Sequence, residues 1–167
     1  MQQAHYDVEH RTLSGAQVKP CSGFTMIELI ITIAVLAIIA LMAAPSFAAM
    51  YNRQKLESSV RELTMKVSEA RSQAVLLRQT TGLCLASLSL EDCATAIAIP
   101  KTDTQRIFIA RLENGVSQTN ASATSLSFRT NGSIAAQKDF VLERQGLSYC
   151  VRVGVIGDTI ITEGACP

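Results

Sequence analysis

The chain has 167 residues and a formal net charge of +1, and charged side chains make up 17% of the sequence. This length accommodates one domain of ordinary size with additional segments. The small net charge gives no electrostatic reason to expect a nucleic acid or a strongly acidic partner. Both histidines, His5 and His10, lie near the N-terminus, so the rest of the sequence has no imidazole for acid–base catalysis.

Residues 1–23 form a polar segment of mixed charge without helical or strand periodicity. Such a segment is typical of a disordered tail or of a leader that a peptidase removes. An ordinary secretory signal would be cut after the apolar run that follows, at the small residues of Ala44–Ala49. The alternative is a cut ahead of the run, after Gly23, where the missing side chain lets a protease approach the backbone closely.

The 24 residues from Leu29 to Asn52 contain no Asp, Glu, Lys or Arg. A helix of about 20 apolar residues is long enough to span a bilayer. The run exceeds the apolar core of about 7–15 residues that is usual in signal peptides. We therefore predict a membrane-spanning helix over residues 24–50, kinked by Pro45 because proline interrupts the helical hydrogen bonds.

Glu28 stands at the start of this run, where ionisation is unfavourable. A charged side chain inside the hydrocarbon costs at least ~2.5 kcal/mol. Cleavage after Gly23 would supply a cationic partner, since it exposes the α-amine of Phe24 about one helical turn away. The other interpretation is that Glu28 reaches the cytoplasmic membrane surface without a specific partner.

The helix is predicted to continue to Leu77, with an amphipathic half over residues 51–81. Apolar residues recur there at alternating spacings of four and three, which indicates one narrow apolar stripe with a polar opposite face. The stripe consists of Leu56, Val60, Leu63, Val67, Ala70, Ala74 and Leu77. A coiled coil would give the same pattern, but a sheet in the same chain also needs a cover, so we expect the stripe to pack there.

Residues 82–167 are predicted to form a β-rich domain, because short apolar stretches alternate with turn signals such as Asn114-Gly115, which favours a tight hairpin. A polar stretch at 117–125 is expected to be a loop. The strands are expected at Leu83–Leu88, Thr95–Ile99, Arg106–Leu112, Leu126–Arg129, Asp139–Arg144, Ser148–Val155 and Thr159–Thr162. The predicted fold class is α+β, with an antiparallel sheet on the amphipathic half-helix.

Four of the five cysteines, Cys84, Cys93, Cys150 and Cys166, lie in this domain. Their spacing does not match the short pairs of a zinc site, so we expect no metal and no cofactor. Two disulfides are the better interpretation, and they place the domain in an oxidising compartment. Of the three possible pairings we favour Cys84–Cys93 and Cys150–Cys166, because each closes a short loop.

The stretch Gly23-Phe24-Thr25-Met26-Ile27-Glu28-Leu29 resembles the class III signal of type IV pilins and type II secretion pseudopilins. The resemblance implies cleavage after Gly23 by a prepilin peptidase and N-methylation of Phe24. Glu28 becomes the fifth mature residue and would pair with the amine of a neighbouring subunit during assembly. Pro45 becomes the twenty-second, where these pilins commonly carry a kinking proline. The implied partners are other pilins, the inner-membrane assembly platform and membrane lipid.

Further stretches resemble the GspH/FimT/FimU branch of minor pilins and pseudopilins. They are Glu69–Ala74, Leu83–Leu85, Phe128–Gly132 and a C-terminal strand pair closed by a cysteine. The resemblance implies a structural, non-enzymatic subunit at or near the tip of a type IV pilus. The closest alternative is a GspH-type minor pseudopilin of a type II secretion system. Either protein would cross the inner membrane once and hold its C-terminal domain in the periplasm.

Some FimT-like minor pilins bind DNA through a C-terminal Gly-Arg-x-Arg stretch, but here the corresponding Gly154–Asp158 contains no arginine. From Gly82 onward, seven basic residues stand against eight acidic ones. Phosphate binding requires clustered positive charge, so DNA binding is ranked lower. It would require Arg106, Arg111, Arg129, Arg144 and Arg152 to converge in the fold. A further alternative is a soluble secreted binding domain with an ordinary signal peptide.

Overall fold

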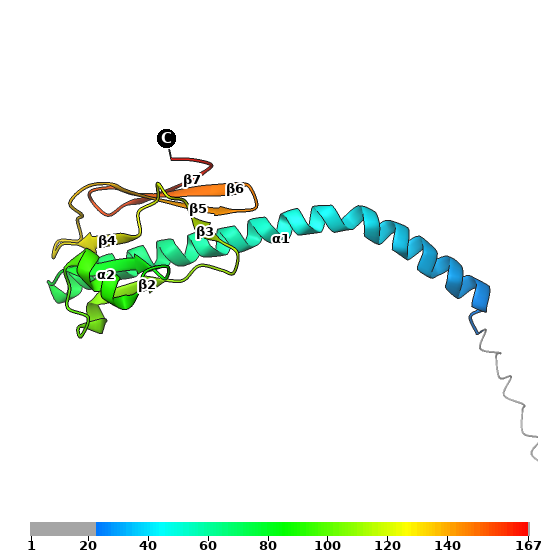
Figure 1. Ribbon diagram of the computed structural model, residues 1–167, viewed down its shortest axis with the longest axis horizontal. Coiled ribbons are helices and arrows are strands. Elements are labelled where there is room, and N and C mark those ends of the chain that lie inside the picture. Colours follow the sequence, from blue (N-terminus) through cyan, green and yellow to red (C-terminus); the bar gives the residue numbers. More distant parts are fainter. Residues whose placement is uncertain (1–22, 167) are drawn as a thin grey trace, which may run out of the picture. The chain divides into compact units, whose positions relative to one another are not determined.

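The computed structural model describes residues 23–166, so the predicted leader lies, apart from Gly23, outside the described residues. The chain forms two compact units, and the boundary between them lies between Leu41 and Met42. A long helix precedes a region of short strands with a second helix (Figure 1). This arrangement confirms the predicted α+β class.

The helices are α1 (Met26–Leu77), α2 (Leu90–Ile97) and the short 3₁₀ helix η1 (Thr104–Arg106). The strands are β1 (Thr81–Leu85), β2 (Ile107–Ala110), β3 (Ser117–Gln118), β4 (Ser125–Phe128), β5 (Lys138–Arg144), β6 (Leu147–Val153) and β7 (Thr159–Glu163).

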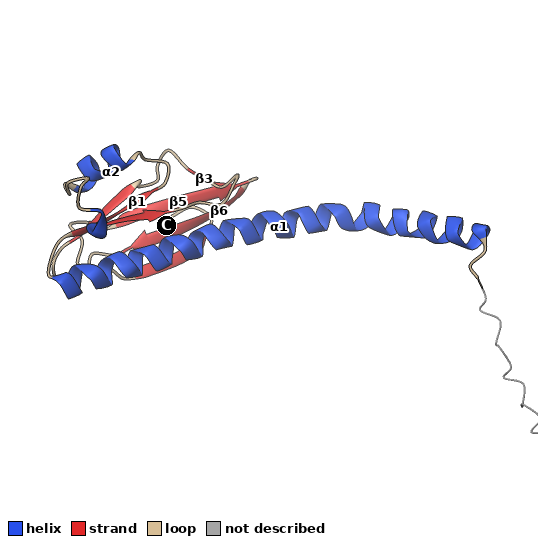
Figure 2. Ribbon diagram, turned by 90° about the horizontal axis from the view of Figure 1, so that it is seen from below, coloured by secondary structure: helices blue, strands red, loops and turns tan. Residues whose placement is uncertain are grey.

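The second half of α1 buries one stripe of side chains, as its sequence period predicts. Its buried residues are Leu56, Ser59, Val60, Leu63, Val67, Ala70 and Ala74. Strands lie along this part of the helix (Figure 2), so the stripe packs on the chain's own sheets. Leu77 was predicted to continue the stripe but is 43% exposed, because the helix ends there and Arg78 adopts a left-handed conformation.

The strands form two sheets, with the orders β2-β1-β4 and β3-β5-β6-β7. Their ladders are antiparallel except for the parallel pair of β1 and β2. The predicted antiparallel arrangement is confirmed, and the parallel pair of β1 and β2 is an exception to it. Parallel neighbours require a crossover connection, and here that connection contains α2.

The predicted strand at Thr95–Ile99 is wrong, because most of that segment belongs to α2. The signal that was missed is a helix N-cap: Ser89 accepts a hydrogen bond from the Asp92 amide at 3.1 Å. The apolar positions then follow helical spacing, so that Cys93, Ala94 and Ile97 face inward. Ala98 ends the helix in a left-handed conformation.

The turn at Asn114-Gly115 forms, with the Val116 amide bonded to the Glu113 carbonyl at 2.9 Å. The hairpin predicted around it does not, since β2 and β3 on its two sides belong to different sheets. The predicted loop at 117–125 likewise contributes the two residues of β3 to an edge of the second sheet. By contrast, Gln145-Gly146 joins β5 and β6 directly, and both residues have positive φ as a tight hairpin requires.

In the described part of the domain, buried side chains form two apolar clusters, and β1 separates them. Leu83 and Leu85 point into the larger cluster, which contains the α1 stripe and the inward faces of β4, β5 and β6. Cys84 points to the opposite side, into a smaller cluster with Cys93 and Ile97 of α2. Every residue of β1 is buried in consequence.

Two disulfides join residues of the described chain, Cys84 to Cys93 and Cys150 to Cys166. These are the two pairings that we predicted because each closes a short loop of the chain. The first fastens α2 to β1 inside the smaller cluster. The second fastens the C-terminal residues to β6, so that β7 lies within a closed loop.

Replacing Gly82 with alanine is expected to destabilise the domain by about 1–3 kcal/mol, because added atoms overpack a close contact. A Cβ at this position would lie 2.3 Å from Cδ1 and 2.8 Å from Cβ of Ile97. Urea unfolding of a soluble fragment that starts at Tyr51 would measure the change. Adding Ile97→Ala should give a total smaller than the sum of the two single changes, whereas simple additivity would contradict the contact.

Asp139 on β5 should make the stability of the domain depend on pH. Its carboxylate accepts hydrogen bonds from Arg152 at 2.9 and 3.0 Å, which lowers the pKa of Asp139 below its ordinary value. The stabilisation is therefore present above the pKa of the unfolded chain, near 4, and is lost as the pH falls through the lower folded value. Asp139→Asn should reduce the free energy of unfolding at pH 7 and hardly at all at pH 2.

Urea unfolding of the same fragment at pH 7, 5 and 2 would test this dependence. Glu143→Gln is the matched control, because Glu143 is exposed on the same strand. A difference between Asp139→Asn and the unaltered fragment that stays constant from pH 7 to pH 2 would contradict the role of the ion pair.

Candidate functional site

The junction of Gly23 and Phe24 lies ahead of α1 in non-helical chain. Phe24 is 79% exposed, and within residues 23–166, its chain neighbours apart, nothing lies within 4 Å of the position that a Cβ on Gly23 would occupy. The first structural restraint comes at Thr25, whose hydroxyl accepts a hydrogen bond from the Glu28 amide at 3.2 Å. Among the described residues, no other part of the chain covers the peptide bond between Gly23 and Phe24.

Glu28 occupies the first turn of α1, where the positive end of the helix dipole favours a carboxylate. Thr25 and Glu28 have the spacing of a capping box, a signal that the sequence analysis missed. Within residues 23–166, the Glu28 carboxylate makes no ion pair. Its charge is therefore available to a group outside the described chain.

The helix that follows Glu28 is apolar on all sides and exposed throughout residues 26–50. Its most apolar window of 18 residues has a mean hydropathy of 2.7, and none of that window is buried. A soluble core helix of this composition would be covered by other parts of its chain. This segment has the length and composition to cross a membrane. Pro45 lies inside the continuous helix, and the kink expected at Pro45 stays a prediction.

Residues that carried the resemblance to the GspH branch meet at the C-terminal end of α1. The Arg71 side chain donates a hydrogen bond to the Gly157 carbonyl at 3.3 Å. A Cβ on Gly157 would lie 2.8 Å from Cδ of Arg71, and one on Gly132 would lie 3.3 Å from Cγ. Both glycines have positive φ and let their turns approach the arginine stem. These motifs therefore fix two turns of the sheets on the helix.

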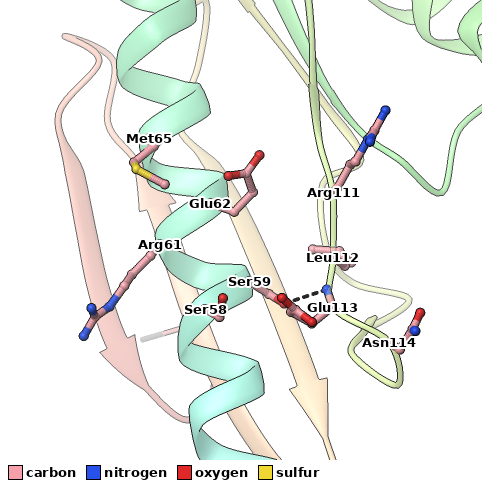
Figure 3. Close-up of a pocket in the computed structure, with 9 residues that line it drawn as sticks. All are labelled: Ser58, Ser59, Arg61, Glu62, Met65, Arg111, Leu112, Glu113 and Asn114. Carbon is pink, nitrogen blue, oxygen red and sulfur yellow. Dashed lines mark hydrogen bonds between the residues drawn. The ribbon is translucent and has the colours of Figure 1, made fainter.

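A groove of about 540 Å³ lies between α1 and the segment 111–114 (Figure 3). Ser59 of the helix is buried and accepts a hydrogen bond from the Glu113 amide at 2.9 Å. Lys55 donates to the Glu113 carboxylate at 2.5 Å, and this bond raises the pKa of Lys55. Arg61 points away from the segment (Figure 3). These bonds hold the segment 111–114 on the helix, and they give the Ser59 hydroxyl a structural role.

Asp139, Cys150 and Cys166 place possible metal-binding atoms within 4.8 Å of one another. Both cysteines are joined in a disulfide, so neither offers a thiolate. The Asp139 carboxylate is bonded to Arg152. This group of residues therefore has the chemistry of a structural contact.

Three of the five arginines considered for DNA binding, Arg106, Arg144 and Arg152, bond to partners within the described chain, whereas Arg111 and Arg129 are exposed. Arg106 pairs with Asp103 at 2.6 Å, and Arg152 pairs with Asp139 at 2.9 Å. Arg144 donates to the Asn52 side chain at 3.0 Å. The stretch Gly154–Asp158, which was compared with the DNA-binding stretch of FimT-like pilins, contains no arginine and exposes Val155 and Ile156.

Comparison with known families gives two matches. Residues 18–44 match the prokaryotic N-terminal methylation motif, which covers Gly23, Phe24 and Glu28. Residues 59–157 match the family described as type II transport protein GspH. No curated protein and no solved structure shows significant similarity to the chain.

The second match extends from the buried stripe of α1 to the β6–β7 turn, and it covers more than half of the chain. It includes the contact of Arg71 with Gly132 and Gly157. The methylation motif precedes it on the exposed apolar helix. The chain belongs to the GspH family of type IV pilin-like proteins.

Proposed function

We propose that this protein is a minor pilin that occupies the tip of a type IV pilus, or a position near it, and assists pilus assembly. Membership of the GspH family supports the coarser statement, a minor pilin or pseudopilin of a type IV pilus or type II secretion system. That family is structural rather than catalytic. The observation that carries the proposal is the exposed apolar helix with Glu28 in its first turn.

Maturation begins with cleavage after Gly23 by a prepilin peptidase, followed by methylation of the new amine on Phe24. The match to the methylation motif and the exposed, non-helical junction support this step. The alternative cut within Ala44–Ala49 falls in the middle of α1, where a protease would have to unwind the helix. This position argues against the ordinary signal peptide of a soluble secreted domain.

Assembly depends on the charge of Glu28. In lipid, the carboxylate is unfavourable unless a cation neutralises it. The α-amine of Phe24 in a neighbouring subunit is such a cation, and pairing with it selects one axial register between adjacent helices. The described chain provides no competing ion pair for Glu28, which supports a partner in another subunit.

Before assembly, the protein crosses the inner membrane once, with residues 82–167 in the periplasm. Two disulfides support this orientation, because they form in oxidising compartments. The inner-membrane assembly platform then draws the helix into the filament beside other minor and major pilins. The amphipathic half of α1 stays covered by its own sheets, so residues 24–50 make the contacts within the filament core.

A minor pseudopilin of a type II secretion system is the second candidate. The family match itself favours it, since the matched family is described as a type II transport protein. The two disulfides and the FimU-like motifs favour the pilus. Neighbouring genes separate the candidates: pilus minor pilins support the first, and a secretion operon supports the second. DNA uptake ranks below both, because the corresponding stretch Gly154–Asp158 contains no arginine.

The native protein is expected to begin at Phe24 with one methyl group on its amine. Mass spectrometry of protein purified from membranes or filaments would show this mass. Gly23→Val should accumulate uncleaved precursor, because a side chain obstructs the approach of the peptidase to the backbone. A mature chain that begins at Ala49 or Met50 would instead identify a secreted soluble domain.

Glu28→Gln is expected to lower incorporation into filaments at least tenfold, since a charge-assisted bond contributes about 1.5–3 kcal/mol. Immunoblots of sheared filaments and of membranes would give the ratio of assembled to membrane-held protein. Glu62→Gln, on the same helix, controls for loss of a carboxylate. Incorporation at the normal level by Glu28→Gln would end the electrostatic account of assembly.

A further inference from the structure

A cluster of one aromatic ring and two cations stands at the point where the apolar helix meets the folded domain. Tyr51 directly follows the exposed apolar residues and is 47% exposed itself. The ammonium of Lys55, one helical turn further on, lies 5.8 Å from the centre of the Tyr51 ring. The guanidinium of Arg144, at the end of β5, lies 5.9 Å from the same centre. We call these three residues the interfacial cluster.

Hydrogen bonds hold Arg144 at this position. Its Nε donates to Oδ1 of Asn52 at 3.0 Å, and Nη1 donates to the carbonyl of Asn114. The end of the β5–β6 hairpin and the turn before β3 are thereby fixed beside the first helical turn after the apolar residues. Residues 42–50 belong to the same compact unit as these contacts.

The nearby cations Arg53 and Lys55 pair with carboxylates, whereas Arg144 bonds, among the described residues, only to neutral acceptors. Lys55 pairs with Glu113 at 2.5 Å, and Arg53 pairs with Glu57 at 3.1 Å. The acceptors of Arg144 are a neutral amide oxygen and a backbone carbonyl, and in the described part of the chain it makes no ion pair. A guanidinium has five donors in a planar fork, so donors remain for an external phosphate oxygen.

A tyrosine ring beside basic side chains is the composition that membrane proteins place at the level of lipid headgroups. We propose that the interfacial cluster binds the headgroup of an anionic phospholipid, with Arg144 on the phosphate and the Tyr51 ring beside the glycerol. The proposal rests on the proposed insertion of residues 24–50 in the membrane. It adds a lipid contact that holds the domain at a fixed depth and that must break when the subunit enters a filament.

The absence of tryptophan from the sequence allows a direct test. In the full-length chain, Tyr51→Trp places a single fluorescent indole at the cluster, and indole, like phenol, prefers the interface. The protein would be reconstituted in vesicles that contain phosphatidylcholine and phosphatidylglycerol, with one or the other lipid brominated. The ratio of the two quenching efficiencies gives the relative association of the anionic lipid with this site.

Phosphatidylglycerol is expected to be preferred about fivefold, which corresponds to ~1 kcal/mol for one cation near an anionic surface. Adding Arg144→Gln should reduce the preference to about one, while Arg144→Lys should keep most of it because the charge remains. Arg61→Gln, an exposed cation about 15 Å further along the helix, should leave it unchanged. If Arg144→Lys removes the preference as completely as Arg144→Gln, the residue has a structural role and the proposal is wrong.

The same measurement separates the two hypotheses. Quenching by both brominated lipids without preference would overturn the lipid site and leave membrane insertion standing. An indole that no brominated lipid quenches would show that residue 51 is remote from the bilayer, and it would count against the proposed membrane anchor as well.

Discussion

The structure depends on one helix, α1, whose two halves differ in how much of their apolar surface the chain itself buries. From Leu56 to Ala74 a single stripe of α1 packs against two sheets, and the polar side of the helix remains in water. Residues 26–50 are apolar on every side and none of them is buried by the described chain. The hydrophobic effect disfavours that exposure, so an apolar environment such as lipid or other helices would stabilise the first half.

The first turn of α1 combines two uses of the same carboxylate. Glu28 lies at the third position of a capping box that starts at Thr25, where a negative charge stabilises the beginning of a helix. It is also the charge that an exposed apolar helix can least tolerate unless it is neutralised. One residue can therefore stabilise the start of the helix and, in the proposed assembly, pair with a cation of a neighbouring subunit.

Periodicity in the sequence was sufficient to predict α1, its buried stripe and most strands, because each of these signals is local. It failed for α2, because alternating apolar residues in this segment suggested a strand. The N-cap Ser89 and the helical spacing of Cys93 and Ile97 were the signals for a helix. It also failed for the pairing of β2, since the choice between a hairpin and a crossover depends on packing between distant segments. At the site, a short motif predicted the roles of Gly23, Phe24 and Glu28, whereas the contacts of Arg71 and Arg144 join segments far apart in the sequence and carry no local signature.

The position of β1 between two apolar clusters has a consequence for the way the domain opens. Leu83 and Leu85 face α1, and Cys84 faces α2, so this strand cannot leave either side without exposing both clusters to water. The segment around α2 and the four-stranded sheet β3-β5-β6-β7 should therefore unfold in a single cooperative transition. In the native protein, the backbone amides of β1 should be among the slowest to exchange with deuterium, because only global opening releases them.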